Sequence, residues 1–199
     1  MTFIVVNFIF IILIFLISAV IARILIPRIL LISLRKKLFD IPDDRKVHKR
    51  AIPRLGGVSF FPTTLFAFCL VYTFRLLGGD SVSTLYASYL LPELLLFACG
   101  MTLLYLTGIA DDLVGVRYRQ KFVIQIFCAC LFPLSGLWIN DLYGLFGIHE
   151  LSVYVGIPFT ILTVVFITNA INLIDGIDGL ASGLSSVALL IFTFLFINK

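Results

Sequence analysis

The chain has 199 residues, of which 61% are hydrophobic and 13% charged, and its formal net charge at pH 7 is +4. An average soluble domain is about half apolar and about one quarter charged, so this composition leaves too little polar surface for a water-soluble globule. The composition excludes a cytosolic enzyme, a disordered chain and a small disulfide-rich secreted module, and it indicates a protein that crosses a membrane several times.

Six apolar segments follow one another along the chain, each long enough to cross the hydrocarbon core as a helix. The first is predicted to be a retained span, because it lacks the basic leading region of a signal peptide and exceeds its usual apolar length. No segment alternates polar and apolar residues with a period of two, so helices are expected instead of barrel strands. The predicted class is all-α, a polytopic membrane helix bundle of about six spanning helices, at residues 3–22, 55–74, 89–110, 122–140, 151–174 and 180–198.

The loops between these segments differ in charge. Lys and Arg are dense between the first two segments, and Arg117, Arg119 and Lys121 lie between the third and fourth. Positively charged loops stay in the cytoplasm, so the first, third and fifth loops are expected to face inward and the N-terminus outward. Seven of the eleven acidic residues lie in the same three loops. The topology rule does not require them there, because acids count little in it.

The third segment ends in two adjacent carboxylates, Asp111 and Asp112. Acids are unfavourable at a helix C-terminus, where the helix dipole is negative, so a metal ion, a metal-bound phosphate or a basic neighbour is expected to compensate them. Arg117, Arg119 and Lys121 are close enough in sequence to form a purely structural ion cluster instead. Both interpretations stay open from these residues alone.

The fifth loop carries a polar residue at every third position: Asn169, Asn172, Asp175 and Asp178. Neighbours three residues apart share one side of a helical turn, so the two asparagines can pair, as can the two aspartates. Gly176 and Gly179 allow the backbone to unwind and to approach a ligand. Ser186 at the twelfth position excludes a calcium-binding EF-hand, and no Walker A sequence is present. Carboxylates and carboxamides are costly to place at a membrane interface, so a functional site is indicated.

The first loop ends in Pro53-Arg54-Leu55-Gly56-Gly57, at the start of the second segment. A proline, a guanidinium and two glycines form a plausible phosphate-holding turn, whereas a bare charge run would only contact anionic lipid. His48, in the same loop, supports no metal site by itself. The four cysteines lie within apolar segments without paired spacing, and they are interpreted as small buried hydrophobes.

Together, the three inward loops resemble the polyprenyl-phosphate N-acetylhexosamine-1-phosphate transferases, a glycosyltransferase 4 type family. The resemblance is closer to the branch that uses UDP-N-acetylglucosamine than to the phospho-N-acetylmuramoyl-pentapeptide branch. The matching stretches are D-x-P-x-x-R-K-x-H-x-x-x-x-P-R-L-G-G (Asp40 to Gly57), G-x-x-D-D (Gly108 to Asp112) and N-A-x-N-L-x-D-G-x-D-G-L (Asn169 to Leu180). Three ordered motifs that span nearly the whole chain make a specific signature.

The resemblance implies transfer of N-acetylglucosamine 1-phosphate from UDP-N-acetylglucosamine to undecaprenyl phosphate, with release of UMP. The implied place is the cytoplasmic face of the bacterial inner membrane, and the product starts a cell-envelope polysaccharide. Mg²⁺ is the implied cofactor, with Mn²⁺ as a substitute. The expected partners are the nucleotide sugar, the polyprenyl phosphate and membrane lipid; a homodimer is compatible with the resemblance. No nucleic acid is expected, because the basic residues are read as topology signals.

The resemblance also implies roles for individual residues. Catalytic roles are expected for Asp111, Asp112, Asp175 and Asp178. Substrate-binding roles are expected for His48, Arg54, Gly56, Gly57, Lys121 and Asn169, and metal-binding roles for Asn172 and Asp175. The base role often given to the position of Asp111 stays provisional, because a phosphate monoester is already largely dianionic near pH 7. Phosphoryl transfer depends mostly on positioning and charge neutralisation.

Family members usually have ten or eleven spanning helices, and their later loops carry another metal-binding aspartate and a histidine- and arginine-rich phosphate site. We therefore expect residues 1–199 to form a single integral-membrane domain, the N-terminal part of a longer fold, and to transfer little or nothing alone. Two alternatives stay open. One is a related transferase that uses another UDP-N-acetylhexosamine, including the phospho-N-acetylmuramoyl-pentapeptide type. The other is a non-enzymatic transport or structural membrane protein.

Overall fold

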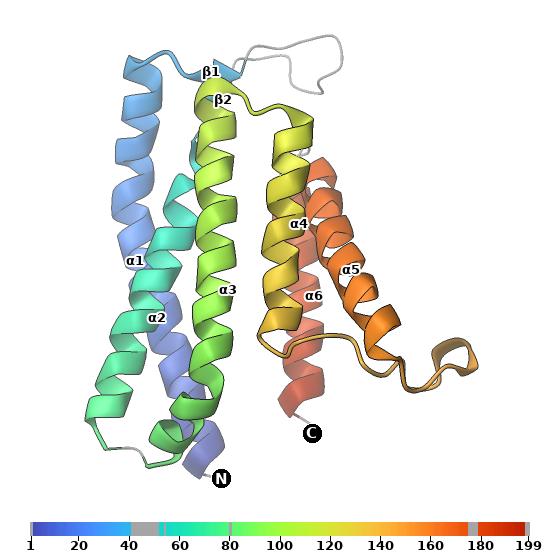
Figure 1. The fold of residues 1–199 in the computed structure, drawn as a ribbon. Helices are drawn as coiled ribbons and strands as arrows, with labels where there is room; N and C mark the ends of the chain where they lie inside the picture. Colours follow the sequence, from blue (N-terminus) through green and yellow to red (C-terminus); the bar gives the residue numbers. More distant parts are fainter. Residues whose placement is uncertain (1, 41–51, 54, 80, 175–178, 198–199) are drawn as a thin grey trace. The chain divides into compact units, whose positions relative to one another are not determined.

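The computed structural model describes residues 2–40, 52–53, 55–79, 81–174 and 179–197, and most of these are helical (Figure 1). Short elements accompany the helices: strand β1 (Phe39–Asp40) pairs antiparallel with β2 (Ile52–Pro53), and 3₁₀ turns form at η1 (Gly56–Ser59) and η2 (Leu145–Gly147). The α-helices of this part of the chain are α1 (Thr2–Arg35), α2 (Phe60–Leu77), α3 (Ser81–Val114), α4 (Tyr118–Leu134), α5 (Val153–Ile174) and α6 (Leu180–Ile197).

Several of these helices have the length and composition of membrane spans. Four stretches within the described ranges qualify: Val6–Arg35, Gly56–Leu77, Leu90–Val114 and Val153–Ile174. The apolar stretch of α6, Leu180–Phe196, is shorter, and α4 has 17 residues. The prediction of an all-α polytopic membrane bundle is therefore confirmed. The count of six spans and the outward N-terminus stay predictions.

Some predicted helix boundaries are wrong by several residues. The first helix continues through Arg23 and Arg28 to Arg35, and the third begins at Ser81. The fourth ends at Leu134 instead of Asn140. Gly136 adopts a φ of +88°, and the N–H groups of Gly136 and Leu137 donate to the carbonyls of Pro133 and Phe132, each at 3.0 Å. This Schellman arrangement, with glycine in the left-handed position, stops the helix.

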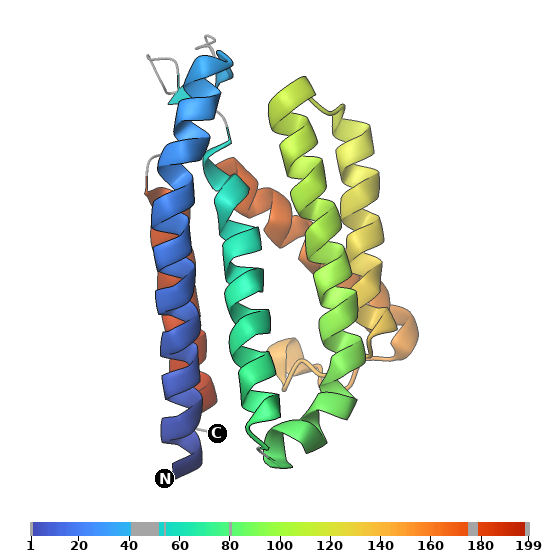
Figure 2. The same ribbon diagram turned by 90° about the vertical axis from the view of Figure 1, so that its left-hand side faces the viewer.

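The chain divides into two compact units, the first containing α1 to α4 and the second α5 and α6. In the first unit α1 packs along α2, and α3 packs along α4 (Figure 2). The buried positions of η1 and α2 recur every four residues and are small: Ser59, Thr63, Ala67 and Val71. Small residues at this spacing let helix backbones approach closely, which is how membrane helices pack without a hydrophobic driving force.

Glycine provides the close approach between α3 and α4. A Cβ atom added at Gly100 would lie 3.4 Å from Leu131 Cδ1 and 3.8 Å from the Cys128 carbonyl oxygen. Cys128 is buried, as expected, but Cys69 and Cys99 are exposed, so the prediction that all four cysteines are buried is wrong. A small apolar side chain faces lipid as readily as it faces protein, so composition alone does not choose between the two.

The outer surfaces of the helices carry large apolar side chains, as a lipid-covered protein requires. Phe15 on α1, Phe166 on α5 and Phe196 on α6 are all about 70% exposed. Hydroxyl side chains on the helices bond to the carbonyl four residues earlier, at 2.7 Å for Thr102 to Ala98 and 2.8 Å for Thr163 to Phe159. These bonds satisfy the hydroxyls without water, which is absent from the hydrocarbon core.

Candidate active site

The predicted site residues fall into three groups in the structure. The first unit holds Gly56 and Gly57 in η1, Asp111 and Asp112 in the last turn of α3, and Lys121 near the start of α4. The second unit holds Asn169 and Asn172 near the end of α5. The remaining predictions, for His48, Arg54, Asp175 and Asp178, lie outside the described residues.

The turn between α3 and α4 is short and depends on one glycine. Gly115, with φ +73°, follows directly after α3 and donates its N–H to the Asp111 carbonyl at 2.9 Å. Glycine adopts this left-handed conformation without the penalty of a Cβ atom. Arg117 is already extended, with φ −61° and ψ 137°, and α4 begins at Tyr118.

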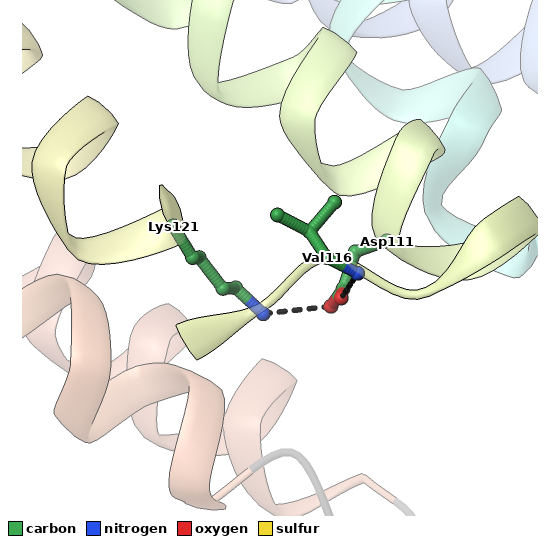
Figure 3. Close-up of polar contacts among 3 residues, drawn as sticks. All are labelled: Asp111, Val116 and Lys121. Atoms are coloured by element: carbon green, nitrogen blue, oxygen red, sulfur yellow. Dashed lines mark hydrogen bonds and ion pairs between the residues drawn. The ribbon is translucent and has the colours of Figure 1, made fainter. Parts of the chain in front are cut away.

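The Asp111 carboxylate connects the two ends of this turn (Figure 3). Its Oδ1 accepts the backbone N–H of Val116 at 3.0 Å, and its Oδ2 accepts a hydrogen bond from Lys121 Nζ at 2.8 Å. Both side chains of the ion pair are about 30% exposed. The carboxylate in the last turn of α3 is thus compensated by a lysine and a backbone donor, as the unfavourable helix dipole requires. The structural ion pair left open by the sequence is present between these two residues.

The two adjacent aspartates face different neighbours. Successive helical residues are about 100° apart around the helix axis, at about 3.6 residues per turn. Asp111 lies eleven residues after Gly100, close to three full turns, so both lie on the face of α3 that packs against α4. Asp112 lies seven residues after Tyr105, close to two full turns, so it shares the face that carries Tyr105.

Tyr105 joins α3 to the glycine turn of η1. Its hydroxyl donates to the Val58 carbonyl at 3.0 Å, and its ring lies 5.2 Å from that of Phe61. Asp112 therefore lies on the η1-facing side of α3, about 10 Å further along the axis at about 1.5 Å per residue. Tyr105 was not identified from the sequence. Its spacing of two helical turns from Asp112 could have placed both residues on one face of the helix, but it could not have identified Val58 as the partner of Tyr105.

The glycine turn is open to its surroundings. A Cβ atom added at Gly56 or Gly57 would meet no protein atom within 4 Å, and neither glycine has a positive φ. The strained residue is Leu55, with φ +73°, whose carbonyl accepts the Val58 N–H at 3.2 Å. Neither packing nor backbone conformation within the described chain requires these two glycines. This fits a turn whose backbone a ligand approaches closely.

The asparagines of α5 occupy its last two turns. Asn169 is partly buried, and its Nδ2 donates to the Val165 carbonyl at 2.8 Å, whereas the Asn172 side chain is exposed. The helix stays regular to Ile174, and Gly179, with φ +78°, precedes α6. Within the ranges that the structure describes, no three His, Cys, Asp or Glu residues gather as a metal-binding group.

Comparisons with known proteins agree with the resemblance. Residues 94–199 match glycosyl transferase family 4. The probable undecaprenyl-phosphate N-acetylglucosaminyl 1-phosphate transferase of Bacillus subtilis is 31% identical over 159 residues, which cover 79% of this chain and 40% of that protein. The undecaprenyl-phosphate alpha-N-acetylglucosaminyl 1-phosphate transferase of Thermotoga maritima is also 31% identical, over 79% of this chain and 43% of that protein.

A third relative comes from another branch. The phospho-N-acetylmuramoyl-pentapeptide-transferase of Staphylococcus carnosus is 32% identical over 70% of this chain and 44% of that protein. No solved structure matches the chain. The chain spans 40 to 44% of the length of these three curated relatives. The family match covers residues 94–199, which is more than half of this chain, so the chain belongs to glycosyl transferase family 4.

Proposed function

We propose that the protein transfers N-acetylglucosamine 1-phosphate from UDP-N-acetylglucosamine to undecaprenyl phosphate and releases UMP. An oxygen of the lipid phosphate forms a bond to the phosphorus that carries the sugar. The bond from that phosphorus to the bridging oxygen breaks, and UMP leaves with the electron pair. The proposed place is the cytoplasmic face of the bacterial inner membrane, where the nucleotide sugar and the polyprenyl phosphate meet.

The observation that carries this proposal is the clustering of charged side chains and an open glycine turn at one end of the first unit. The Asp111–Lys121 ion pair, Asp112 and the open turn of Gly56 and Gly57 all lie where predicted spanning helices end. Phosphate groups are held by lysine and by exposed backbone N–H groups, and the lipid phosphate lies at the depth of helix ends. A nucleotide sugar and a lipid phosphate fit such a site.

The geometry supports different roles for the two aspartates. Asp111 already accepts bonds from Lys121 Nζ and the Val116 N–H, so we assign it to positioning: it holds the turn and directs Lys121. Asp112, on the η1-facing side of α3, is assigned to the reacting groups. No strong base is needed, because the lipid phosphate is largely dianionic near pH 7. Lys121 would bind that phosphate, and Asn169 would border the nucleotide.

The predicted metal residues fit Mg²⁺ by their donor atoms. Asn172 offers an exposed carboxamide oxygen, and Asp175, outside the described residues, offers a carboxylate. Mg²⁺ takes oxygen ligands, commonly one or two carboxylates together with substrate phosphates, and Mn²⁺ accepts similar ligands. When bound, the ion would neutralise charge that develops on the transferred phosphoryl group.

A radiolabelled transfer assay tests this proposal. Membranes that contain the longest native form of the protein are supplied with undecaprenyl phosphate, Mg²⁺ and labelled UDP-N-acetylglucosamine. Label in the lipid phase together with released UMP supports the proposal; its absence with active control membranes contradicts it. The 199-residue chain alone is expected to transfer little or nothing, and measurable turnover from it would contradict that expectation.

A second candidate is transfer of another UDP-N-acetylhexosamine, favoured by the similarity to the Staphylococcus carnosus phospho-N-acetylmuramoyl-pentapeptide-transferase. The same membranes supplied with UDP-N-acetylgalactosamine and UDP-N-acetylmuramoyl-pentapeptide decide between the donors. A transport or structural role predicts no label in lipid with any donor. Magnesium-dependent thermal stabilisation by a UDP-sugar would argue against that role.

A further inference from the structure

The segment that precedes α5 folds into a compact hairpin, which we define as residues 140–151. Its backbone closes on itself: the N–H of Leu151 donates to the Asn140 carbonyl at 2.8 Å, and that of Leu142 donates to the His149 carbonyl at 3.0 Å. The N–H of Gly144 donates to the Ile148 carbonyl at 3.0 Å near the tip. The hairpin thus has a defined shape of its own (Figure 1).

The tip of the hairpin displays aromatic rings from strained positions. Tyr143 and Phe146 have φ values of +51° and +57°, the left-handed region that bulky residues avoid. Their side chains are 82% and 90% exposed, and Leu145 and Ile148 beside them are also exposed. A strained backbone that holds large rings away from the protein is a structural cost, and its persistence points to a function.

The base of the hairpin is fastened to the start of α5. The Ile139 N–H donates to Thr160 Oγ1 at 2.8 Å, and the same hydroxyl donates to the Gly156 carbonyl at 2.7 Å. Thr160 is buried, so this link is protected. At the other side, α5 begins at Val153, two residues after the hairpin ends. Both ends of the hairpin are therefore held near the first turns of a helix that has the length and composition of a membrane span.

Large apolar side chains are exposed along α5 as far as its Val153 end, next to the hairpin. Leu162 and Phe166 are exposed along the helix, and Tyr154 in its first turn is 91% exposed. A helix of this kind places its end at the boundary between acyl chains and headgroups. Tyrosine and tryptophan are enriched at this boundary, because each side chain carries both an apolar ring and a polar group.

We propose that the hairpin is an interfacial anchor whose tip residues, Tyr143, Leu145, Phe146 and Ile148, insert into the bilayer at the Val153 end of α5. The occupant of this apolar surface is lipid. No Lys or Arg occurs between Phe122 and Asn198, and the hairpin carries Asp141 and Glu150. Its insertion is therefore driven by apolar contact and does not need anionic lipid.

Depth-dependent fluorescence quenching tests the anchor in the 199-residue chain. Trp138 is the only tryptophan, so Trp138→Phe combined with Phe146→Trp places a single reporter at the tip. The protein is reconstituted in neutral phosphatidylcholine vesicles whose acyl chains carry bromine either near the headgroup or near the bilayer centre. We expect stronger quenching by shallow than by deep bromine, and weak quenching by aqueous iodide.

Leu162→Trp in the same background calibrates depth, because this exposed residue lies in the third turn of α5 and is expected to respond more to deep bromine. Tyr143→Trp is a second tip reporter if Phe146→Trp does not fold. If iodide quenches the tip reporter and bromine does not, the tip lies in water and the proposal is wrong. If neither iodide nor bromine quenches the tip reporter, protein covers the tip, either a second copy or another segment, and the proposal is wrong. If bromine near the bilayer centre quenches it more strongly than bromine near the headgroup, the tip does not lie at the interface and the proposal is also wrong.

Discussion

The turn between α3 and α4 and the hairpin between α4 and α5 both reverse the chain, but they present opposite chemistry. The first is short and charged, and its carboxylate, lysine and backbone N–H satisfy one another. The second is longer and has no Lys or Arg, and backbone hydrogen bonds close it while its aromatic side chains are exposed. Each uses left-handed residues, but glycine occupies that position in the short turn, whereas Tyr143 and Phe146 also occupy it in the hairpin.

The two connections are therefore suited to different surroundings. A turn that holds its charges in defined pairs is suited to bind anions, because each group is already oriented. A hairpin whose backbone groups largely bond to one another is suited to contact lipid, because fewer donors have to be satisfied there by water.

The largest effect is expected from Asp112→Asn in the charged turn. Loss of one charge among groups that stabilise the transition state lowers turnover about 100- to 1000-fold. The assay is labelled sugar-phosphate transfer into lipid, with kcat and KM determined separately. Asp141→Asn is the matched control in the hairpin: its Oδ1 accepts the Tyr143 N–H, which an amide oxygen also accepts, so activity should change less than twofold. Equal losses in the two variants would remove the functional distinction between the loops.

A smaller effect is expected from Asp111→Asn, because this residue acts through Lys121. The amide keeps an acceptor for Val116 but loses the ion pair, so transfer falls about tenfold, as for other supporting residues. The loss should appear mainly in KM for polyprenyl phosphate, and Lys121→Gln should shift the same parameter.

The double variant Asp111→Asn/Lys121→Gln tests the coupling. If Asp111 only positions Lys121, the double variant loses no more than the Lys121 variant alone. Additive losses, or a loss confined to kcat, would instead show that Asp111 acts on the reacting groups. Thermal unfolding measures the effect of each variant on stability. The partly exposed ion pair should contribute only about 0.5 kcal/mol to the free energy of unfolding.

Tyr105→Phe separates the hydroxyl that reaches η1 from the ring that packs on Phe61. Loss of the bond to the Val58 carbonyl should lower the free energy of unfolding by about 1 kcal/mol. Transfer should fall modestly, because the glycine turn loses a fixed support. Tyr72→Phe is the control, since its ring stacks on Phe68 within α2. An unchanged rate and stability in Tyr105→Phe would show that α3 does not position η1.

The smallest effect on transfer is expected from alanine at hairpin glycines, because these substitutions change only the local stability of the hairpin. Gly144→Ala places a Cβ atom 3.2 Å from His149 Cε1 at a φ of +84°. The variant therefore loses stability both through a close steric contact and through an unfavourable backbone conformation. Gly147→Ala, with φ +75° and open space, meets the backbone penalty alone, about 1 kcal/mol. Hydrogen exchange at the Leu142 amide measures both. His149→Ala should bring Gly144→Ala to the level of Gly147→Ala, and no such rescue would contradict the steric account.

Much of the fold could be predicted because apolar segments are a local property. The segments at residues 151–174 and 180–198 agree closely with α5 and α6, since length and composition decide whether a helix crosses lipid. The end of α4 was missed because the apolar composition continues past Leu134 to Ile139, while Gly136 stops the helix through two hydrogen bonds. Apolar composition alone therefore does not predict where backbone geometry ends a helix.

Polarity and spacing along the chain are enough to predict a membrane helix bundle with acidic and basic residues beside its helix ends. The neighbours of the two aspartates depend on helix packing: Asp111 faces α4 and pairs with Lys121, while Asp112 shares the Tyr105 face towards η1. The physical reason is angular: adjacent residues on a helix point about 100° apart, and the neighbour that each one meets depends on which helix packs there.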